Sequence, residues 1–509
     1  MRVAKGAGAI ADNCLNCVFS FKQIVGAMGL WALLGLFVSA WATSPLRPCR
    51  VEGMPNELLC GQVSRPLDPG KPDGILIEVH FVVVPAMARN KQPDPVLLLA
   101  GGPGQSAIAL APVVMGRFGR LNNRRDVVFI DQRGTGKSAP LQCRDESELP
   151  LAQALDPQLQ QERLLQCRAE LSKLPHGDTR FYTTTIAMQD FEAVRSSLGA
   201  PQWNLVGASY GTRAALEYLR QYPGKVRRTV LDGVAPADMV LPVSFSIDSQ
   251  AALDASLQAC EGLTDCAKHY PRLREEWADL LGSLPRRVAV SHPLTGLVES
   301  FVLTRDMLLR AVRGPLYAPA FAAALPAAIH AASQGRWEGV IGLSGTIGSG
   351  KNMRLAMGMH FSVICAEDIP RMGASSAAVG ADFSRMDVKL YTQACANWPT
   401  GNVPAAFYEI PVAPSPVLLL SGGADPATPP RHAERVQRAL DSKAQHIVVP
   451  QGGHGVMGVG CMQEVVFRFI DTRLDEAALP QDASCATKIP RPGAFVLVRS
   501  TADVSGVRP

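Results

Sequence analysis

Short runs dominated by apolar residues restrict the fold of this chain more than any other feature of its sequence. The runs lie at residues 75–84, 95–100, 126–130, 204–206, 229–231, 416–420 and 446–449. Runs without polar alternation are typical of strands buried on both faces, as in a parallel sheet covered by helices. Between the third and fourth runs, apolar residues recur at helical spacing from Thr183 to Gly199. This order predicts an α/β fold with a mostly parallel central sheet.

The strand rhythm is interrupted between about residues 236 and 404. This stretch is rich in Ala, Leu and Pro, with a helical pattern at residues 319–335. We expect a core in two parts, residues 43–235 and 405–480, separated by a large, mainly helical insertion at 236–404 and followed by a tail at 481–509. A chain of 509 residues, 47% hydrophobic and 19% charged, is long and apolar enough for such a core.

The first 42 residues have the composition of an export signal. Arg2, Lys5 and Lys22 precede an uncharged stretch at residues 24–42 that ends in Ala40-Trp-Ala42. This arrangement predicts a secretory signal peptide cleaved after Ala42, and hence a periplasmic or secreted protein. Because the apolar stretch is about long enough to span a bilayer, an uncleaved signal-anchor is the alternative. Only in that case do we expect an association with a membrane.

Cysteine usage agrees with export. Cys14 and Cys17 lie in the predicted signal, and the other ten of the twelve cysteines form an even set, which is typical of disulfides in an oxidising compartment. Pairing nearest neighbours would join Cys49 to Cys60, Cys143 to Cys167, Cys260 to Cys266, Cys365 to Cys395, and Cys461 to Cys485. The sequence does not determine this connectivity. We assign these cysteines a structural role rather than redox or metal chemistry.

Gly207-Ala-Ser209-Tyr-Gly211 follows the fourth apolar run and matches the Gly-x-Ser-x-Gly turn of a nucleophile elbow. In an elbow, a strained bend between strand and helix lifts the serine hydroxyl clear of the sheet. Glycines flank the serine because side chains there would collide where strand and helix come close. The pattern is short enough to occur by chance, so the assignment of Ser209 as a nucleophile depends on partners elsewhere in the chain.

Two candidate partners lie late in the chain. A serine nucleophile needs a base to take its proton and a carboxylate to hold that base in the right tautomer. In hydrolases with this elbow the chain order is Ser, then Asp or Glu, then His, with both partners on loops after late strands. Asp425 follows the run at 416–420, and His454 follows the run at 446–449. We therefore predict Asp425 as the acid and His454 as the base.

Other residues compete for these roles. Asp232 also follows a strand and is the alternative acid, but we expect it to hydrogen-bond backbone locally. His446 would lie inside a strand and His432 in the helix that follows Asp425, so both are expected to be structural. The sequence has no His-Glu-x-x-His or comparable ligand spacing, and we predict no catalytic metal.

Three glycine-rich segments are candidate ligand-binding loops. Gly101-Gly-Pro-Gly-Gln-Ser106 ends the second run, where its backbone N–H groups could form an oxyanion hole; a tight turn or a phosphate cradle is the alternative. Residues 131–138 and 345–351 look like phosphate loops, but Asp131 replaces the first glycine of one, and Asn352 replaces the magnesium-binding Ser or Thr of the other. We predict no nucleotide binding and interpret residues 131–138 as a brace for the active-site face.

The net charge of +5 is spread along the chain, with no block of consecutive Lys or Arg. We therefore interpret these charges as a solvated surface and predict no nucleic-acid partner.

Together these motifs resemble the α/β-hydrolases of the proline iminopeptidase and tripeptidyl aminopeptidase type. The shared segments are 101–106, 131–138, 207–212 and 231–234, followed by Asp425 and His454. Cys365-Ala-Glu-Asp368 and Cys395-Ala-Asn-Trp-Pro399 are similar to the secreted tripeptidyl aminopeptidase-like branch. Ala100 stands where iminopeptidases usually have His, which argues against a strict preference for proline.

The resemblance implies a role for each matching residue. Ser209 is the nucleophile, His454 the base and then the acid, and Asp425 the group that orients His454. The backbone N–H groups of Gly102 and Tyr210 hold the oxyanion. An acyl-enzyme would form and be hydrolysed without a cofactor, and the insertion would be a lid over the site.

An exopeptidase must also recognise a free α-amine, for which a carboxylate is the natural partner. Glu367 and Asp368 are the candidates, and a surface or capping pair is the alternative. The leading hypothesis is an exported serine aminopeptidase that acts on peptides and releases short peptides or single residues. An esterase or other small-molecule hydrolase with the same triad is the nearest alternative, because fold and triad do not fix the substrate. A non-catalytic, hydrolase-like binding protein is more remote, and the sequence does not indicate the oligomeric state.

Overall fold

The structure is a computed structural model that describes residues 46–144, 149–293, 295–344, 354–373, 382–384 and 387–496. The predicted signal at residues 1–42 and the loop at 345–351 lie outside these residues. No helix within the described ranges is long and apolar enough to cross a membrane.

Nine strands of the described chain form one sheet, in the order β1-β2-β3-β5-β4-β6-β7-β10-β11. They are β1 (Arg47–Cys49), β2 (Leu58–Pro66), β3 (Leu76–Val84), β4 (Val96–Leu99), β5 (Val127–Ile130), β6 (Trp203–Ala208), β7 (Val226–Asp232), β10 (Val417–Gly422) and β11 (Ala444–Val449). The strands from β5 to β11 in this order pair in parallel. β1, β2 and β3 pair antiparallel with one another, and β3 pairs antiparallel with β5. The predicted, mostly parallel sheet is therefore confirmed.

Helices cover both faces of the sheet. Side chains alternate along β4, where Leu97 and Leu99 face one hydrophobic core and Val96 and Leu98 face the other. The first core packs against α4 (Thr184–Ser197), α5 (Tyr210–Gln221) and α15 (Pro430–Leu440), and the second against α1 (Ala107–Phe118) and α16 (Met462–Asp471). Because both faces are covered, the parallel strands are apolar at almost every position, as the sequence pattern indicated.

The chain between β7 and β10 is mainly helical. Its helices are α6 (Val243–Glu261), α7 (Thr264–His269), α8 (Leu273–Gly282), α9 (Arg305–Leu316), α10 (Pro319–Ala322), α11 (Leu325–Ser333), α12 (Glu338–Ser344), α13 (Met357–Glu367) and α14 (Val388–Cys395). Two features differ from the sequence expectation. The helix expected at 319–335 is divided into α10 and α11, and a hairpin of β8 (Arg286–Ser291) and β9 (Val298–Leu303) lies among the helices.

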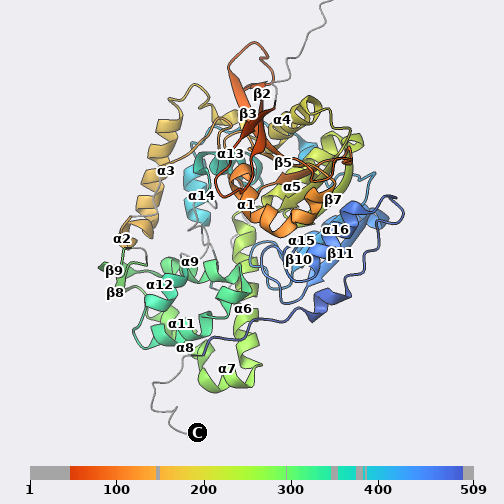
Figure 1. Ribbon diagram of the computed structural model, residues 1–509. Coiled ribbons are helices and arrows are strands. Elements are labelled where there is room, and N and C mark those ends of the chain that lie inside the picture. Colours follow the sequence, from red (N-terminus) through yellow and green to blue (C-terminus); the bar gives the residue numbers. More distant parts are fainter. Residues whose placement is uncertain are drawn as a thin grey trace, which may run out of the picture. The chain divides into compact units, whose positions relative to one another are not determined.

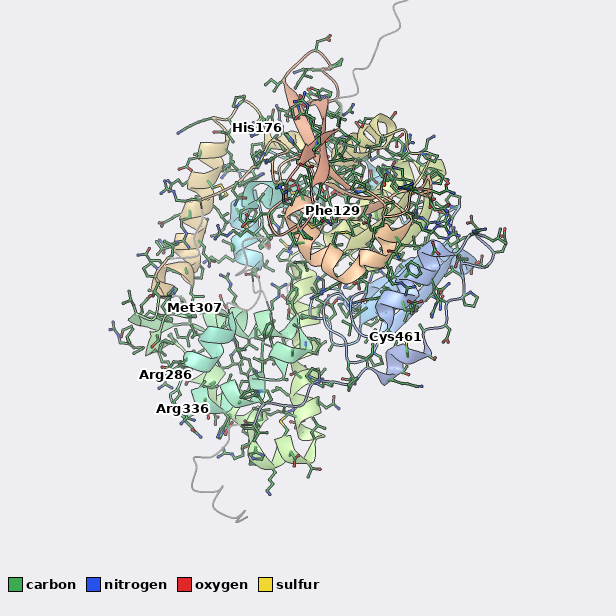
Figure 2. All side chains as sticks on the ribbon, in the orientation of Figure 1. Phe129, His176, Arg286, Met307, Arg336 and Cys461 are labelled. Carbon is green, nitrogen blue, oxygen red and sulfur yellow. A yellow bond between two sulfur atoms is a disulfide. The ribbon has the colours of Figure 1, made fainter. Side chains whose placement is uncertain are left out.

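A separate hydrophobic cluster holds much of this region together. Figure 1 shows α7, α8, α11 and α12 grouped away from the nine-stranded sheet, with the β8–β9 hairpin beside them. Met307 lies in this group, whereas Phe129 lies in the sheet region (Figure 2). Leu151 of α2 (Leu151–Ala154) belongs to the same cluster, and α3 (Pro157–Leu171) follows it in the chain. Residues before the elbow therefore contribute to the core of the insertion.

The structure joins the ten described cysteines as five disulfides between sequence neighbours. The pairs are Cys49–Cys60, Cys143–Cys167, Cys260–Cys266, Cys365–Cys395 and Cys461–Cys485. The predicted connectivity is confirmed. Cys365–Cys395 links α13 to α14, so it ties together two helices of the returning insertion.

Candidate active site

Ser209 lies in the bend between β6 and α5. Its backbone adopts φ 55° and ψ −123°, a region that residues other than glycine rarely occupy. A Cβ on Gly207 would lie 2.4 Å from the oxygen of Gly211, and a Cβ on Gly211 would lie 2.2 Å from the oxygen of Leu99. The flanking glycines are therefore required by close contacts between strand, bend and helix. The geometry matches the predicted nucleophile elbow.

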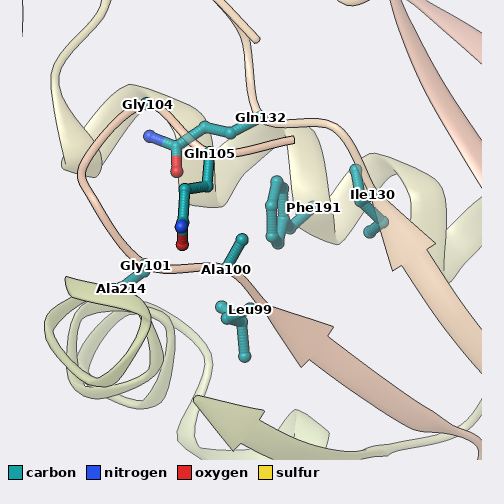
Figure 3. Close-up of a pocket in the computed structure, with 9 residues that line it drawn as sticks. All are labelled: Leu99, Ala100, Gly101, Gly104, Gln105, Ile130, Gln132, Phe191 and Ala214. Atoms are coloured by element: carbon teal, nitrogen blue, oxygen red, sulfur yellow. The ribbon is translucent and has the colours of Figure 1, made fainter. Parts of the chain in front are cut away.

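The Gly101–Gln105 turn lies directly beside the elbow. β4 pairs with β6 through Leu99 and Gly207, and a Cβ on Gly101 would lie 3.3 Å from the Cβ of Ser209. Behind the turn is a small cavity, into which the carboxamides of Gln105 and Gln132 are directed (Figure 3). The turn therefore lies next to Ser209, and the oxyanion role of the Gly102 and Tyr210 N–H groups stays a prediction.

Polar contacts hold the turn from two sides. Asp131 accepts hydrogen bonds from the Ser106 hydroxyl at 2.6 Å and from the Ile108 N–H at 3.1 Å, so residues 131–138 do brace this face. On the other side, Ala356 donates its N–H to the oxygen of Gly104 at 2.9 Å. His360 Nδ1 lies 3.1 Å from the oxygen of Pro103, and because a carbonyl only accepts, this nitrogen carries the proton.

Asp425 and His454 meet at the same edge of the sheet. Both follow strands, β10 and β11, and His454 Nδ1 lies 2.9 Å from Asp425 Oδ2 and 3.1 Å from Oδ1. Asp425 also accepts hydrogen bonds from the N–H groups of Ala427 at 2.8 Å and Thr428 at 2.9 Å, and from the Thr428 hydroxyl at 2.9 Å. The Asp425 side chain is fully buried, whereas 18% of the His454 side chain is exposed. The structure thus brings the predicted acid and base into contact.

The charge states of the two residues support each other. Burial disfavours ionised Asp425, but the charge of His454 and the surrounding hydrogen bonds outweigh it and hold the pKa of Asp425 below its usual value. Burial likewise disfavours the imidazolium, yet the Asp425 carboxylate raises the pKa of His454 above its usual value. This pair suits a base that must carry a proton for part of a reaction.

Asp232, the alternative acid, holds the loop of the base instead. Its carboxylate accepts hydrogen bonds from the N–H groups of Val456 at 2.9 Å and Met457 at 2.8 Å. These partners are backbone groups, as expected, but they lie 224 and 225 positions along the chain rather than nearby. Burial raises the pKa of Asp232 to about 6.

The competing histidines have structural contacts. His446 lies in β11, where its Nε2 lies 2.9 Å from the Ser421 hydroxyl. His432 lies in α15 and contacts the buried Asp248 of α6 at 3.0 Å. Both predictions of structural placement are confirmed.

Glu367 and Asp368 lie in a buried polar cluster at the end of α13. Arg213 of α5 donates to both oxygens of Asp368, at 2.9 Å and 3.1 Å, and lies 3.5 Å from Glu367. Glu367 also accepts from the N–H and the hydroxyl of Thr184, at 2.7 Å and 3.0 Å. Burial raises the pKa of Glu367 to about 7. The role of these carboxylates toward a substrate stays a prediction.

The cluster is linked to the elbow through Tyr210. The Tyr210 hydroxyl lies 2.7 Å from the Thr184 hydroxyl and accepts a hydrogen bond from Gln132 at 3.0 Å. The residue after the nucleophile is therefore anchored at its far end.

No group of three or more His, Cys, Asp or Glu side chains in the described part of the chain is arranged to hold a metal ion.

The insertion also contributes to the site, which none of the sequence motifs indicated. Tyr317 follows α9, and its carbonyl oxygen accepts a hydrogen bond from the backbone N–H of His454 at 2.8 Å. The Tyr317 ring meets the His454 ring edge-on, with the ring centroids 5.1 Å apart. A sequence signal for this contact is Gly453, because a Cβ at this position would lie 2.3 Å from the Tyr317 carbonyl oxygen.

Comparison with known proteins agrees with this geometry. Residues 94–460 match the alpha/beta hydrolase fold family. The chain belongs to this family. A tripeptidyl aminopeptidase from Streptomyces lividans is 25% identical over 479 residues, which cover 86% of each chain. The serine protease Hip1 of Mycobacterium tuberculosis is 27% identical over 240 residues, 44% of this chain and 43% of its own length. A probable proline iminopeptidase from Streptomyces coelicolor is 32% identical over 146 residues, 29% of this chain and 34% of that protein.

These relatives confirm the resemblance inferred from the motifs. They also confirm the expected class of enzyme, a serine hydrolase of the peptidase type.

Proposed function

We propose that this chain is an exported serine aminopeptidase, which releases short peptides or single residues from the N-termini of peptides. Ser209 is the nucleophile, His454 the base and Asp425 the acid that orients it. The contact between His454 and Asp425 carries the proposal. The end of β7 links this pair to the elbow: the Asp232 carbonyl oxygen accepts the Ser209 N–H at 2.9 Å, and a Cβ on the next residue, Gly233, would lie 3.4 Å from the His454 ring. The similarity to a tripeptidyl aminopeptidase over 86% of the chain supports the substrate class, and the five disulfides support export.

The contacts of His454 assign the proton path. Because Nδ1 faces Asp425, Nε2 is left to take the proton of Ser209 as Oγ attacks the peptide carbonyl carbon. The N–H groups of Gly102 and Tyr210 hydrogen-bond the oxyanion. His454 then protonates the leaving amine as the C–N bond breaks. Water attacks the acyl-enzyme, gives its proton to His454, and releases the N-terminal fragment, after which Ser209 regains its proton.

We also propose that Glu367 and Asp368 recognise the α-amine of the substrate. The two buried carboxylates face one guanidinium, Arg213, so the cluster carries one negative charge in excess when both are ionised. The ammonium group of a substrate would neutralise this excess negative charge.

Residues 236–404, in this proposal, form the lid that limits access to short N-terminal segments.

The proposal is tested with aminoacyl and tripeptidyl arylamides, each with a free or N-acetylated N-terminus, and with p-nitrophenyl esters. We expect kcat/KM to be at least about 100-fold higher for the free arylamides, since a lost ion pair at a buried site costs several kcal/mol. Cleavage of esters alone, or indifference to acetylation, would contradict the aminopeptidase. Export is tested by N-terminal sequencing of protein recovered outside the cytoplasm, with Thr43 as the expected first residue.

A further inference from the structure

The insertion contacts the loop of the catalytic base. α9 ends next to Tyr317, whose carbonyl oxygen accepts a hydrogen bond from the backbone N–H of His454 at 2.8 Å. The Tyr317 ring stands at 75° to the His454 ring. Because Gly453 has no side chain, the two segments can approach this closely. The orientation of the His454 ring therefore depends on the position of Tyr317.

The insertion also contacts the loop of the acid. Ser249 of α6 donates its hydroxyl to the carbonyl oxygen of Pro426 at 3.3 Å, and Pro426 directly follows Asp425. The Ser249 side chain is fully buried, so water does not compete for this contact. Two helices of the insertion thus reach the two triad partners separately.

Arg313 of α9 joins these two contacts. Its Nη2 donates to the Tyr317 hydroxyl at 2.9 Å, and its Nε donates to the Ser249 hydroxyl at 3.1 Å. The guanidinium lies over the Phe245 ring at 4.0 Å, and Asp387 lies 3.9 Å from Nη1. A planar, forked cation packed on an aromatic ring is held in one orientation, which an ammonium group would not be.

We propose that Arg313 is a positioning residue, which holds the loops of Asp425 and His454 in register through Ser249 and Tyr317. The insertion then completes the catalytic geometry in addition to covering it. This inference rests on the proposed triad. The charged and titratable groups that face His454 are Asp425 from the β10 loop, Asp232 from the end of β7, and Arg313 and Tyr317 from the insertion. The two carboxylates favour a protonated His454, and the Arg313 cation opposes it.

The test is the rate at which a fluorophosphonate labels Ser209, measured across pH with Arg313→Met and Arg313→Lys. This readout does not depend on the natural substrate. In Arg313→Met we expect labelling to slow by at least about tenfold, because small displacements of catalytic groups cost that much. We also expect the midpoint of the acid limb to move to higher pH, since the opposing cation is gone. Arg313→Lys keeps the charge and the wild-type midpoint but labels slowly, because an ammonium cannot reproduce the fork.

Arg310→Met is the matched control. Arg310 lies on the same helix and pairs with Asp387 at 2.9 Å, and its other contact is to Gln160. We expect it to label like the wild type. Tyr317→Phe removes only the hydroxyl that Arg313 contacts, and it should slow labelling in the same direction even if Arg313→Met does not fold.

Two results would overturn the inference: wild-type rates and midpoint in both Arg313→Met and Tyr317→Phe, or equal losses in Arg310→Met. A wild-type protein that is not labelled at Ser209 would instead refute the proposed nucleophile.

Discussion

Asp232 accepts a hydrogen bond at 2.9 Å from the backbone N–H of Val456, which lies two residues after His454 in the chain. Its second oxygen accepts the N–H of Met457 at 2.8 Å. A carboxylate at the end of β7 thus holds the loop that carries the base, just after His454 in the chain.

Asp232→Asn tests this role. The amide has only one accepting oxygen, so one of the two N–H groups loses its partner in a buried site. We expect the free energy of unfolding to fall by about 1–3 kcal/mol, and kcat for a good arylamide to fall because the His454 loop loosens. Urea denaturation and steady-state kinetics measure the two effects. Unchanged values of both would show that the loop does not need Asp232.

Asp425→Asn tests the orienting acid. Asparagine can present an N–H to His454 Nδ1, which favours the wrong tautomer of the ring. We expect kcat to fall by about 10³–10⁴ with little change in the thermal unfolding midpoint. Activity within tenfold of the wild type would rule out Asp425 as the acid.

Gly211→Ala tests the packing of the elbow. Its Cβ would lie 2.2 Å from the oxygen of Leu99, a backbone atom that cannot move aside alone. We expect a loss of several kcal/mol or a failure to fold. Gly116→Ala is the control, because Gly116 is exposed within α1 and a Cβ there meets no atom within 4 Å. That change should raise the free energy of unfolding by up to about 1 kcal/mol. Equal effects of the two substitutions would contradict the close contact.

Glu367→Gln tests the buried carboxylate cluster through pH. Burial raises the pKa of Glu367 from 4.5 to about 7, so the folded state keeps a proton that the unfolded chain releases in this range. The contribution of Glu367 to stability is therefore present at low pH and is lost as pH rises toward 7. Glu367→Gln cannot ionise, so it does not lose this contribution as the pH rises. Its free energy of unfolding relative to wild type should therefore rise by about 2 kcal/mol between pH 4.5 and pH 7. Denaturation curves at a series of pH values measure it, and a constant difference would contradict the shift.

The central part of the fold was predictable because burial on both faces leaves a plain mark on the sequence. β4, β5, β6 and β10 are apolar at nearly every position, so their runs stand out. The sequence of β2 does not stand out in this way, because the strand is half-buried and carries polar residues such as Gln62 and Arg65 between its apolar ones. The hairpin of β8 and β9 was hidden for the same reason, since alternate residues of both strands face solvent.

The candidate site likewise contains residues that strand order predicts and residues that it does not. Ser209, Asp425 and His454 each follow a strand, so topology brings them to one edge without knowledge of side-chain contacts. Arg313 carries no local signal, because its partners Ser249 and Tyr317 are defined by how α6 and α9 pack. The environment of Glu367 was also hidden, since Arg213 lies 154 residues earlier in the chain.

The most direct test of the central claim is a digest of a peptide library, read by mass spectrometry, with Ser209→Ala as the control. We predict that the wild type releases short fragments or single residues from free N-termini and leaves N-acetylated peptides intact, and that Ser209→Ala releases none. Cleavage inside peptides regardless of the N-terminus, or equal digestion by Ser209→Ala, would contradict it.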